Sequence, residues 1–249
     1  MSIKKHIPNF LTLCNLFCGV VATLFAYHEY YVQAGWIFLL GVTFDFFDGF
    51  TARMLHVKSD IGKELDSLAD CITSGLLPSM VMFTMMKTAL SGTFSAEPLS
   101  DAFPVSPLEI ASAPAFLIVL FSALRLAKFN LDTRQMDSFI GVPTPACALI
   151  VVFLPFLADG GILSSVLANY WVLLVITVVL SLLLVCELPL FALKFKSFGW
   201  KGNQKRWGLI VVAAILIIAL GFRAFPLVIV IYLLLSLWDN VFSGRQKKA

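Results

Sequence analysis

The sequence predicts an all-α polytopic membrane protein with about eight transmembrane helices. Of its 249 residues, 59% are hydrophobic and only 13% are charged, whereas a soluble domain carries about 25% charged residues. Eight apolar stretches approach or exceed the length of about 20 residues that crosses a bilayer. Lysine and arginine gather in alternate connections between these stretches. We expect the whole chain, residues 1–249, to form a single integral membrane domain.

The eight expected spans follow one another along the chain, and the fifth and seventh are short. They are residues 9–27, 33–53, 65–87, 108–128, 143–158, 167–187, 208–223 and 225–242. The first span follows two lysines in the manner of a signal peptide, but it shows no small-residue cleavage site. We therefore expect it to be retained as a helix.

The basic residues predict that both termini lie in the cytoplasm, because cytoplasmic loops carry the excess of lysine and arginine. In this orientation only Lys87 and Arg223, of 18 basic residues, fall near the outer side. Topology and attraction to anionic lipids then account for the net charge of +3, which gives no reason to expect a nucleic-acid partner. We expect a multi-pass protein of the cell (inner) membrane.

Four aspartates stand within 26 residues of a chain that otherwise avoids charge. Asp45 and Asp48 are three residues apart near the end of the second expected span, and Asp66 and Asp70 are four apart near the start of the third. Each pair therefore lies on one helical face. The turn between the two spans is short, so the helices are antiparallel neighbours. We expect all four carboxylates to converge at the cytoplasmic interface.

A cluster of this kind predicts a site for divalent cations, because carboxylates at a membrane cost several kcal/mol unless a cation compensates them. Oxygen ligands select hard cations such as Mg²⁺, Mn²⁺ or Ca²⁺. Three or four carboxylates can hold two such ions about 4 Å apart, which suits phosphoryl transfer. Arg53 can bind a diphosphate, and Gly49 and Gly62 leave room for a ligand.

The spacing of this region resembles the signature of the CDP-alcohol phosphotransferase family. The signature D-x2-D-G-x2-A-R-x8-G-x3-D-x3-D is complete here as Asp45, Asp48, Gly49, Ala52, Arg53, Gly62, Asp66 and Asp70. The phosphatidylserine synthase branch of the family is similar in further segments. These are IPNFLT from Ile7, followed by Asn15 and Gly19, then FDFFDG, GKELDSLAD, LRLAKFN from Leu124, FIGVPTP from Phe139 and KFKSFGWKGNQKR from Lys194. The resemblance covers most of the chain and implies that family's helical fold, a homodimer and a polar cavity open to the cytoplasm.

The resemblance also implies roles for individual residues. Asp45, Asp48 and Asp66 would be metal ligands, and Asp70 would complete a second metal site and act as the general base. The cofactors would be Mg²⁺ or Mn²⁺, two ions in each active site. Six residues would bind the cytidine diphosphate group, namely Asn9, Thr12, Gly49, Ala52, Arg53 and Gly62.

The reaction implied by the resemblance is transfer of the phosphatidyl group from CDP-diacylglycerol to the hydroxyl of L-serine, which gives phosphatidylserine and CMP. The chain would then be one catalytic domain whose donor stays among the membrane lipids. Arg125 is a candidate for the serine carboxylate, because a guanidinium can donate two hydrogen bonds to it. Lys128 and Asn130 lie close by in the sequence. Basic residues at this position also serve as topological anchors, so both interpretations stay open.

Two alternative functions remain open. The same chemistry would suit another acceptor, such as inositol, inositol phosphate, glycerol phosphate or another amino alcohol. A cation transporter, from a different class, would use the carboxylates as an ion path, but transporters place such groups at the membrane midplane, often in broken helices. The position of these carboxylates at one interface, with an arginine and two glycines, favours binding of a nucleotide diphosphate.

Overall fold

The structure, a computed structural model, describes residues 6–57, 59–100, 104–131, 139–159, 163–187, 189–190 and 204–246. Regular structure in these ranges is helical, apart from two strands of two residues each. Five stretches are long and apolar enough to cross a membrane: His6–Tyr27, Tyr31–Met54, Asp60–Leu90, Pro107–Leu131 and Trp207–Ser236. The expectation of an all-helical integral membrane protein is confirmed, whereas the number of crossings and the orientation stay predictions.

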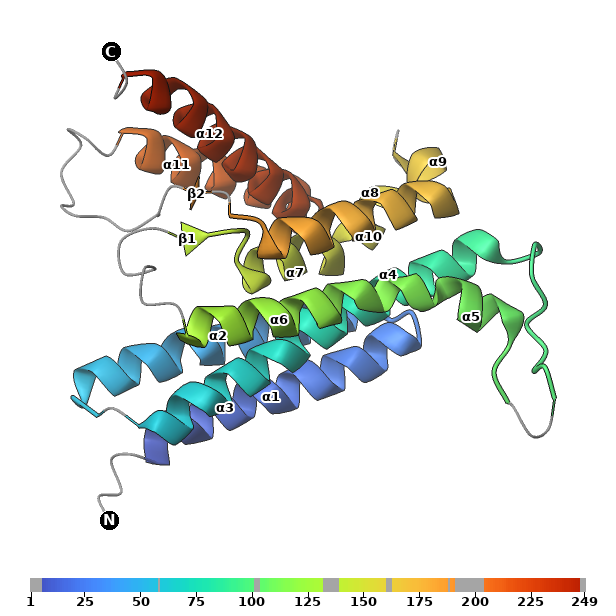
Figure 1. The fold of residues 1–249 in the computed structure, drawn as a ribbon, viewed down its shortest axis with the longest axis horizontal. Helices are drawn as coiled ribbons and strands as arrows, with labels where there is room; N and C mark the ends of the chain where they lie inside the picture. Colours follow the sequence, from blue (N-terminus) through green and yellow to red (C-terminus); the bar gives the residue numbers. More distant parts are fainter. Residues whose placement is uncertain are drawn as a thin grey trace.

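The first three expected spans form the part of the fold that carries the carboxylates. They correspond to α1 (His6–Tyr27), α2 (Tyr31–Met54), and a continuous stretch of α3 (Asp60–Asp70), the π-helical turn η2 (Cys71–Leu76) and α4 (Leu77–Leu90). Successive helices run in opposite directions (Figure 1). Gly19 of α1 faces η2, where an added Cβ would lie 2.9 Å from the Cα of Thr73. Small residues of this kind let membrane helices approach closely.

The rest of the chain continues the same alternation of direction in Figure 1. Its helices are α5 (Pro107–Ser112), η3 (Ala113–Phe116), α6 (Leu117–Leu131), α7 (Thr144–Val152), α8 (Leu154–Ala158), α9 (Ser164–Leu167), α10 (Tyr170–Val185), α11 (Gln204–Leu220), η5 (Gly221–Arg223) and α12 (Ala224–Gln246). The strands β1 (Phe139–Ile140) and β2 (Pro189–Leu190) pair antiparallel, and they join the connections that follow α6 and α10. α1 begins and α12 ends at the same end of the molecule (Figure 1).

Two details differ from the expected spans or refine them. The expected fifth span, 143–158, is divided into α7 and α8 at Phe153. Pro155 has no N–H to donate to Val151, so the α-helical ladder is interrupted there. The stretch Trp207–Ser236 contains two helices, because the chain turns back at Gly221, whose φ of +55° favours glycine.

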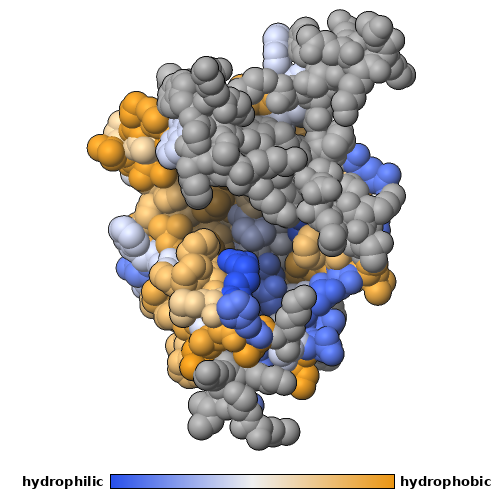
Figure 2. All heavy atoms as spheres, turned by 90° about the vertical axis from the view of Figure 1, so that its left-hand side faces the viewer, coloured by the Kyte–Doolittle hydropathy of each residue, from blue (hydrophilic) through white to orange (hydrophobic). Residues whose placement is uncertain are grey.

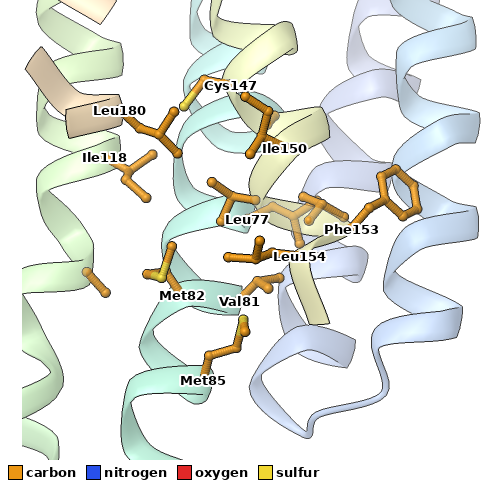
Figure 3. Close-up of a cluster of buried hydrophobic side chains, with 14 of the residues drawn as sticks. Leu77, Val81, Met82, Met85, Ile118, Cys147, Ile150, Phe153, Leu154 and Leu180 are labelled. Atoms are coloured by element: carbon orange, nitrogen blue, oxygen red, sulfur yellow. The ribbon is translucent and has the colours of Figure 1, made fainter. Parts of the chain in front are cut away.

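The apolar core surrounds α4 and supports the carboxylate-bearing end of the fold. Leu77, Val81 and Met82 of α4 are fully buried and pack with residues of α6, α7, α8 and α10 (Figure 3). Phe153, at the break between α7 and α8, is fully buried and stacks on Phe225 of α12, with ring centroids 4.5 Å apart. α3, which continues into α4, is thereby anchored in the centre of the molecule.

Candidate active site

Three aspartates from two helices come together where α2 ends and α3 begins. One carboxylate oxygen from each of Asp45, Asp48 and Asp66 lies within 4.8 Å of the other two. Asp48 is buried and the other two are half-buried. Among the residues that the structure describes, no other group of three histidine, cysteine or acidic side chains comes this close. The convergence expected from the spacing is therefore present.

Asp70 lies beside this group without belonging to it. Its half-buried carboxylate is close enough to Asp48 and Asp66 to experience their negative charge. The helix passes into the π-helical turn η2 directly after Asp70. Such turns are frequent at functional sites. Three of the four predicted carboxylates are thus within reach of one ion, and the fourth lies next to them.

The donors of this cluster suit a divalent metal ion. All are carboxylate oxygens, the ligands that hard cations such as Mg²⁺ and Mn²⁺ prefer. Within the described ranges no lysine or arginine forms an ion pair with any of the four aspartates. Thr12 compensates Asp48 in part, because its Oγ1 donates a hydrogen bond of 2.5 Å to Asp48 Oδ2. Most of the negative charge still requires a cation.

A pocket of about 380 Å³ opens beside the cluster, between α1, α2 and α3. Five residues predicted to bind cytidine diphosphate line it together with Asp48 and Asp66. These five are Asn9, Thr12, Gly49, Ala52 and Gly62. Figure 2 views this end of the molecule and shows hydrophilic residues around a hollow, with hydrophobic residues on its flanks. The structure thus brings these predicted residues into one concave site.

The two glycines of the pocket leave room for different groups, one for a side chain of the protein and the other for a ligand. An added Cβ at Gly62 would lie 2.9 Å from Asn9 Oδ1, so Gly62 makes room for the Asn9 side chain. A Cβ at Gly49 would have only Arg53 Nη1 within 4 Å, at 3.6 Å. Gly49 therefore leaves open space for a ligand. Arg53 is exposed and lies next to Gly49, but it does not line the pocket.

Lys63 is a pocket residue that sequence reasoning treated only as a topological anchor. It lines the pocket, and its Nζ donates a hydrogen bond of 2.9 Å to the backbone oxygen of Asn130. Lys63 lies three residues before Asp66 and so shares its helical face, a signal in the sequence that was sufficient to identify it but was not used. The bond to α6 depends on tertiary packing and has no sequence signal.

The three residues proposed for the acceptor have different surroundings. Arg125 is buried, lies next to Asp70, and donates from Nη1 to Thr144 Oγ1 at 3.4 Å. Asn130 is held against α3, because its Nδ2 donates to Ser67 Oγ at 2.9 Å. Lys128 is exposed and does not line the pocket. Of the three, Arg125 is the one whose charge acts on a carboxylate of the site, that of Asp70. The basic segment 194–203 lies outside the described residues.

The sequence that forms this carboxylate site matches a known enzyme family. The CDP-alcohol phosphatidyltransferase family model matches residues 5–184, which is most of the chain. The chain belongs to this family. The family is named for a CDP-linked alcohol as the donor, and the aspartate cluster of this chain is suited to the divalent metal that the family's chemistry uses.

Curated relatives give a finer comparison. The chain is 33% identical over 147 residues to the CDP-diacylglycerol–serine O-phosphatidyltransferase of Helicobacter pylori, a match that covers 58% of this chain and 55% of the relative. It is 34% identical over 153 residues to the enzyme of the same name from Bacillus subtilis, covering 61% and 76%. It is 30% identical over 148 residues to the archaetidylserine synthase of Methanothermobacter thermautotrophicus, covering 58% and 55%. The match thus spans about half the length of two of these relatives.

Proposed function

We propose that this protein transfers the phosphatidyl group from CDP-diacylglycerol to L-serine and releases phosphatidylserine and CMP. The observation that carries the proposal is the juxtaposition of two features. Asp45, Asp48 and Asp66 come within ligand range of one another, and two of them line a pocket with the residues of the cytidine diphosphate motif. We also propose that the site faces the cytoplasm and that the protein is a homodimer.

The pocket is suited to hold the donor with its diphosphate at the carboxylates. The open space at Gly49 allows the diphosphate to approach α2, and Arg53 beside it offers a guanidinium to the phosphate oxygens. Two divalent ions held by Asp45, Asp48, Asp66 and Asp70 would neutralise the charge that develops on the phosphoryl oxygens. The acyl chains of the donor would remain in the bilayer.

In the chemical step, Asp70 accepts the proton of the serine hydroxyl. The serine oxygen forms a bond to the phosphorus atom that carries diacylglycerol. The bond between this phosphorus and the oxygen of CMP breaks, and CMP leaves with the electron pair. A side-chain base is required because a serine hydroxyl does not ionise by itself near neutral pH. The position of Asp70 beside the other carboxylates and next to Arg125 supports this role.

Two observations support serine as the acceptor. The names of the relatives from Helicobacter and Bacillus specify serine, and that of the archaeal relative specifies archaetidylserine. Arg125 also brings a buried guanidinium next to Asp70, where it would meet a carboxylate attached to the reacting alcohol. A phosphorylated acceptor would require more positively charged side chains at the site. The amine of Lys63 is already hydrogen-bonded to the backbone oxygen of Asn130 and is therefore less suited to bind a second phosphate.

Transport of cations is less compatible with this fold. α3 continues from the carboxylates into α4, whose residues Leu77, Val81 and Met82 are fully buried among apolar side chains (Figure 3). An ion path along this helix would need polar groups in their place. The buried hydroxyls that α4 does carry, those of Ser79 and Thr84, donate to backbone oxygens of the same helical stretch. This packing favours a site that is open at one end.

The proposal is tested by incubating the purified full-length chain with CDP-diacylglycerol and a panel of alcohols, each with Mg²⁺ or Mn²⁺. The panel contains serine, inositol, inositol phosphate and glycerol phosphate, and mass spectrometry identifies the lipid product. We expect phosphatidylserine and an equal amount of CMP. A different phosphatidyl product would contradict serine as the acceptor, and no product from any alcohol would contradict the proposed function.

A further inference from the structure

We propose that Asn15 is a positioning residue that holds the carboxylate of Asp70 through its buried side-chain amide. Sequence analysis gave Asn15 no role in the site. The inference deepens the proposed function and rests on it, because it takes Asp70 to be a metal ligand and the general base. Asn15 would act through Asp70 and would not touch the substrate.

The first observation is that the Asn15 amide is buried without a hydrogen-bond partner. The residue is 1% exposed, and among the described residues neither Nδ2 nor Oδ1 forms a hydrogen bond of good geometry. A buried polar group left unpaired costs on the order of 1–3 kcal/mol. A leucine would fill the same space without that cost. The amide therefore calls for an explanation other than packing.

The second observation is that neighbouring helices pack closely around this side chain and fix its position. Gly41 of α2 lies opposite it, and an added Cβ there would be 3.1 Å from Asn15 Oδ1. Thr73 of η2 fixes the backbone, because its Oγ1 donates a hydrogen bond of 3.2 Å to Asn15 O. Gly41 lies four residues before Asp45, and Thr73 lies three residues after Asp70. The surroundings of the Asn15 side chain are thus formed by the same segments that carry the acidic cluster.

The third observation is the identity of the neighbouring charged group. Asp70 lies next to Asn15, and Arg125 approaches Asp70 from α6. An ionised carboxylate only accepts hydrogen bonds, so the atom that Asn15 can offer it is Nδ2. Asn15 and Arg125 would then hold Asp70 from two helices against repulsion by Asp48 and Asp66.

In this arrangement Asn15 would hydrogen-bond to a metal ligand without binding the metal itself. Hydrogen bonds to ligating carboxylates fix their orientation, and loss of such a partner typically lowers metal affinity or activity 10- to 100-fold. An asparagine supplies the donor without adding charge. An aspartate at this position would add one more negative charge, and a leucine would supply no donor.

The test uses the purified full-length protein with Asn15→Leu, Asn15→Asp and Asn15→Ser. Thr23→Val is the matched control, because Thr23 is also buried on α1 but donates to Gly19 O within its own helix. Mn²⁺ binding is measured by electron paramagnetic resonance without substrates. We expect each Asn15 variant to bind Mn²⁺ about 10-fold or more weakly than the wild type, and the control to bind it normally.

Turnover provides the second readout. We expect kcat of the Asn15 variants to fall about 10-fold or more, whereas KM for CDP-diacylglycerol changes little. If Asn15→Leu does not fold, the smaller Asn15→Ser gives the same test. Wild-type Mn²⁺ affinity and kcat in a folded Asn15 variant would overturn the inference. A wild-type protein that binds Mn²⁺ but makes no phosphatidyl product would contradict the proposed function alone.

Discussion

At the scale of single residues, the site is dominated by an excess of carboxylates over the groups that oppose them. One hydroxyl, that of Thr12, donates to Asp48, and one guanidinium, that of Arg125, lies next to Asp70. Four carboxylates at a membrane interface need more compensation than this. The residues themselves therefore indicate a site completed by cations, and the proposed function divides them into metal ligands and groups that act on the acceptor.

Asp70→Asn tests the assignment of the base. An amide cannot accept the serine proton, and general-base catalysis contributes about 10²- to 10⁴-fold. We expect kcat to fall at least about 100-fold, measured as CMP release from CDP-diacylglycerol. Glu64→Gln is the matched control, because Glu64 is exposed on the same helix, and it should keep wild-type turnover. Near-normal turnover of Asp70→Asn would rule out this base.

Arg125→Lys tests recognition of the acceptor. Lysine keeps the positive charge but loses the planar pair of donors that fits a carboxylate. We expect KM for serine to rise about 10-fold, which corresponds to about 1.4 kcal/mol, with KM for CDP-diacylglycerol unchanged. Lys128→Ala, at an exposed position on the same helix, should leave both values near wild type. An unchanged KM for serine in Arg125→Lys would show that Arg125 does not bind the acceptor.

At this scale the sequence identified most of the site but not its supports. The family resemblance assigned Thr12, Gly49 and Gly62 to the cytidine diphosphate site, and all three line the pocket. It gave no role to Asn15, whose surroundings depend on how closely α1 approaches α2 and η2. Helical periodicity shows which residues share a face, but it does not show which side chain of another helix meets that face.

At the scale of elements, the site depends on α1, which packs against both α2 and α3, whereas α2 and α3 make little direct contact with each other. The hydrophobic stretches and the short turn predicted that the two carboxylate-bearing helices are antiparallel, but not that α1 joins them. The π-helical turn η2 was not predictable, because Cys71–Leu76 has the same apolar and small residues as the α-helical stretches around it. The break at Phe153 had a sequence signal in Pro155, which sequence reasoning passed over.

Gly49→Ala tests whether the wall of the pocket on α2 lies against the donor. The protein alone leaves space for a Cβ at this position, so the fold should be retained. The methyl group would intrude on the bound diphosphate, and we expect KM for CDP-diacylglycerol to rise several-fold. Gly208→Ala on α11 is the matched control, because nothing lies within 4 Å of its added Cβ. Equal kinetics in both variants would contradict the placement of the diphosphate.

At the scale of the whole molecule, the polar site lies at the end of the molecule where α1 begins and α12 ends (Figures 1 and 2). The two basic residues predicted for the outer side are engaged by the protein. Lys87 pairs with Glu109 at 3.7 Å, and Arg223 donates to the backbone oxygens of Phe156 and Asp159, each at 3.0 Å. The sequence predicted that only these two basic residues lie near the outer side, but the side of the membrane that each end of the molecule faces is still a prediction.

Cysteine labelling in whole cells tests the orientation. Glu64 and Ser95 are both exposed, near the carboxylates and in the connection between α4 and α5, respectively. A membrane-impermeant thiol reagent should label Ser95→Cys in intact cells but label Glu64→Cys only after permeabilisation. The wild type, whose five cysteines are buried or half-buried, controls for background labelling. The reverse pattern would place the site on the outer side.

The most direct measurement concerns the metal requirement of the aspartate cluster. The purified protein is stripped with excess chelator, and CMP release from CDP-diacylglycerol and serine is followed before and after Mn²⁺ is restored in excess. We expect no turnover of the stripped wild type, full recovery with Mn²⁺, and no recovery of Asp66→Asn. Full turnover in the continued presence of the chelator would contradict paired divalent ions as the basis of this site.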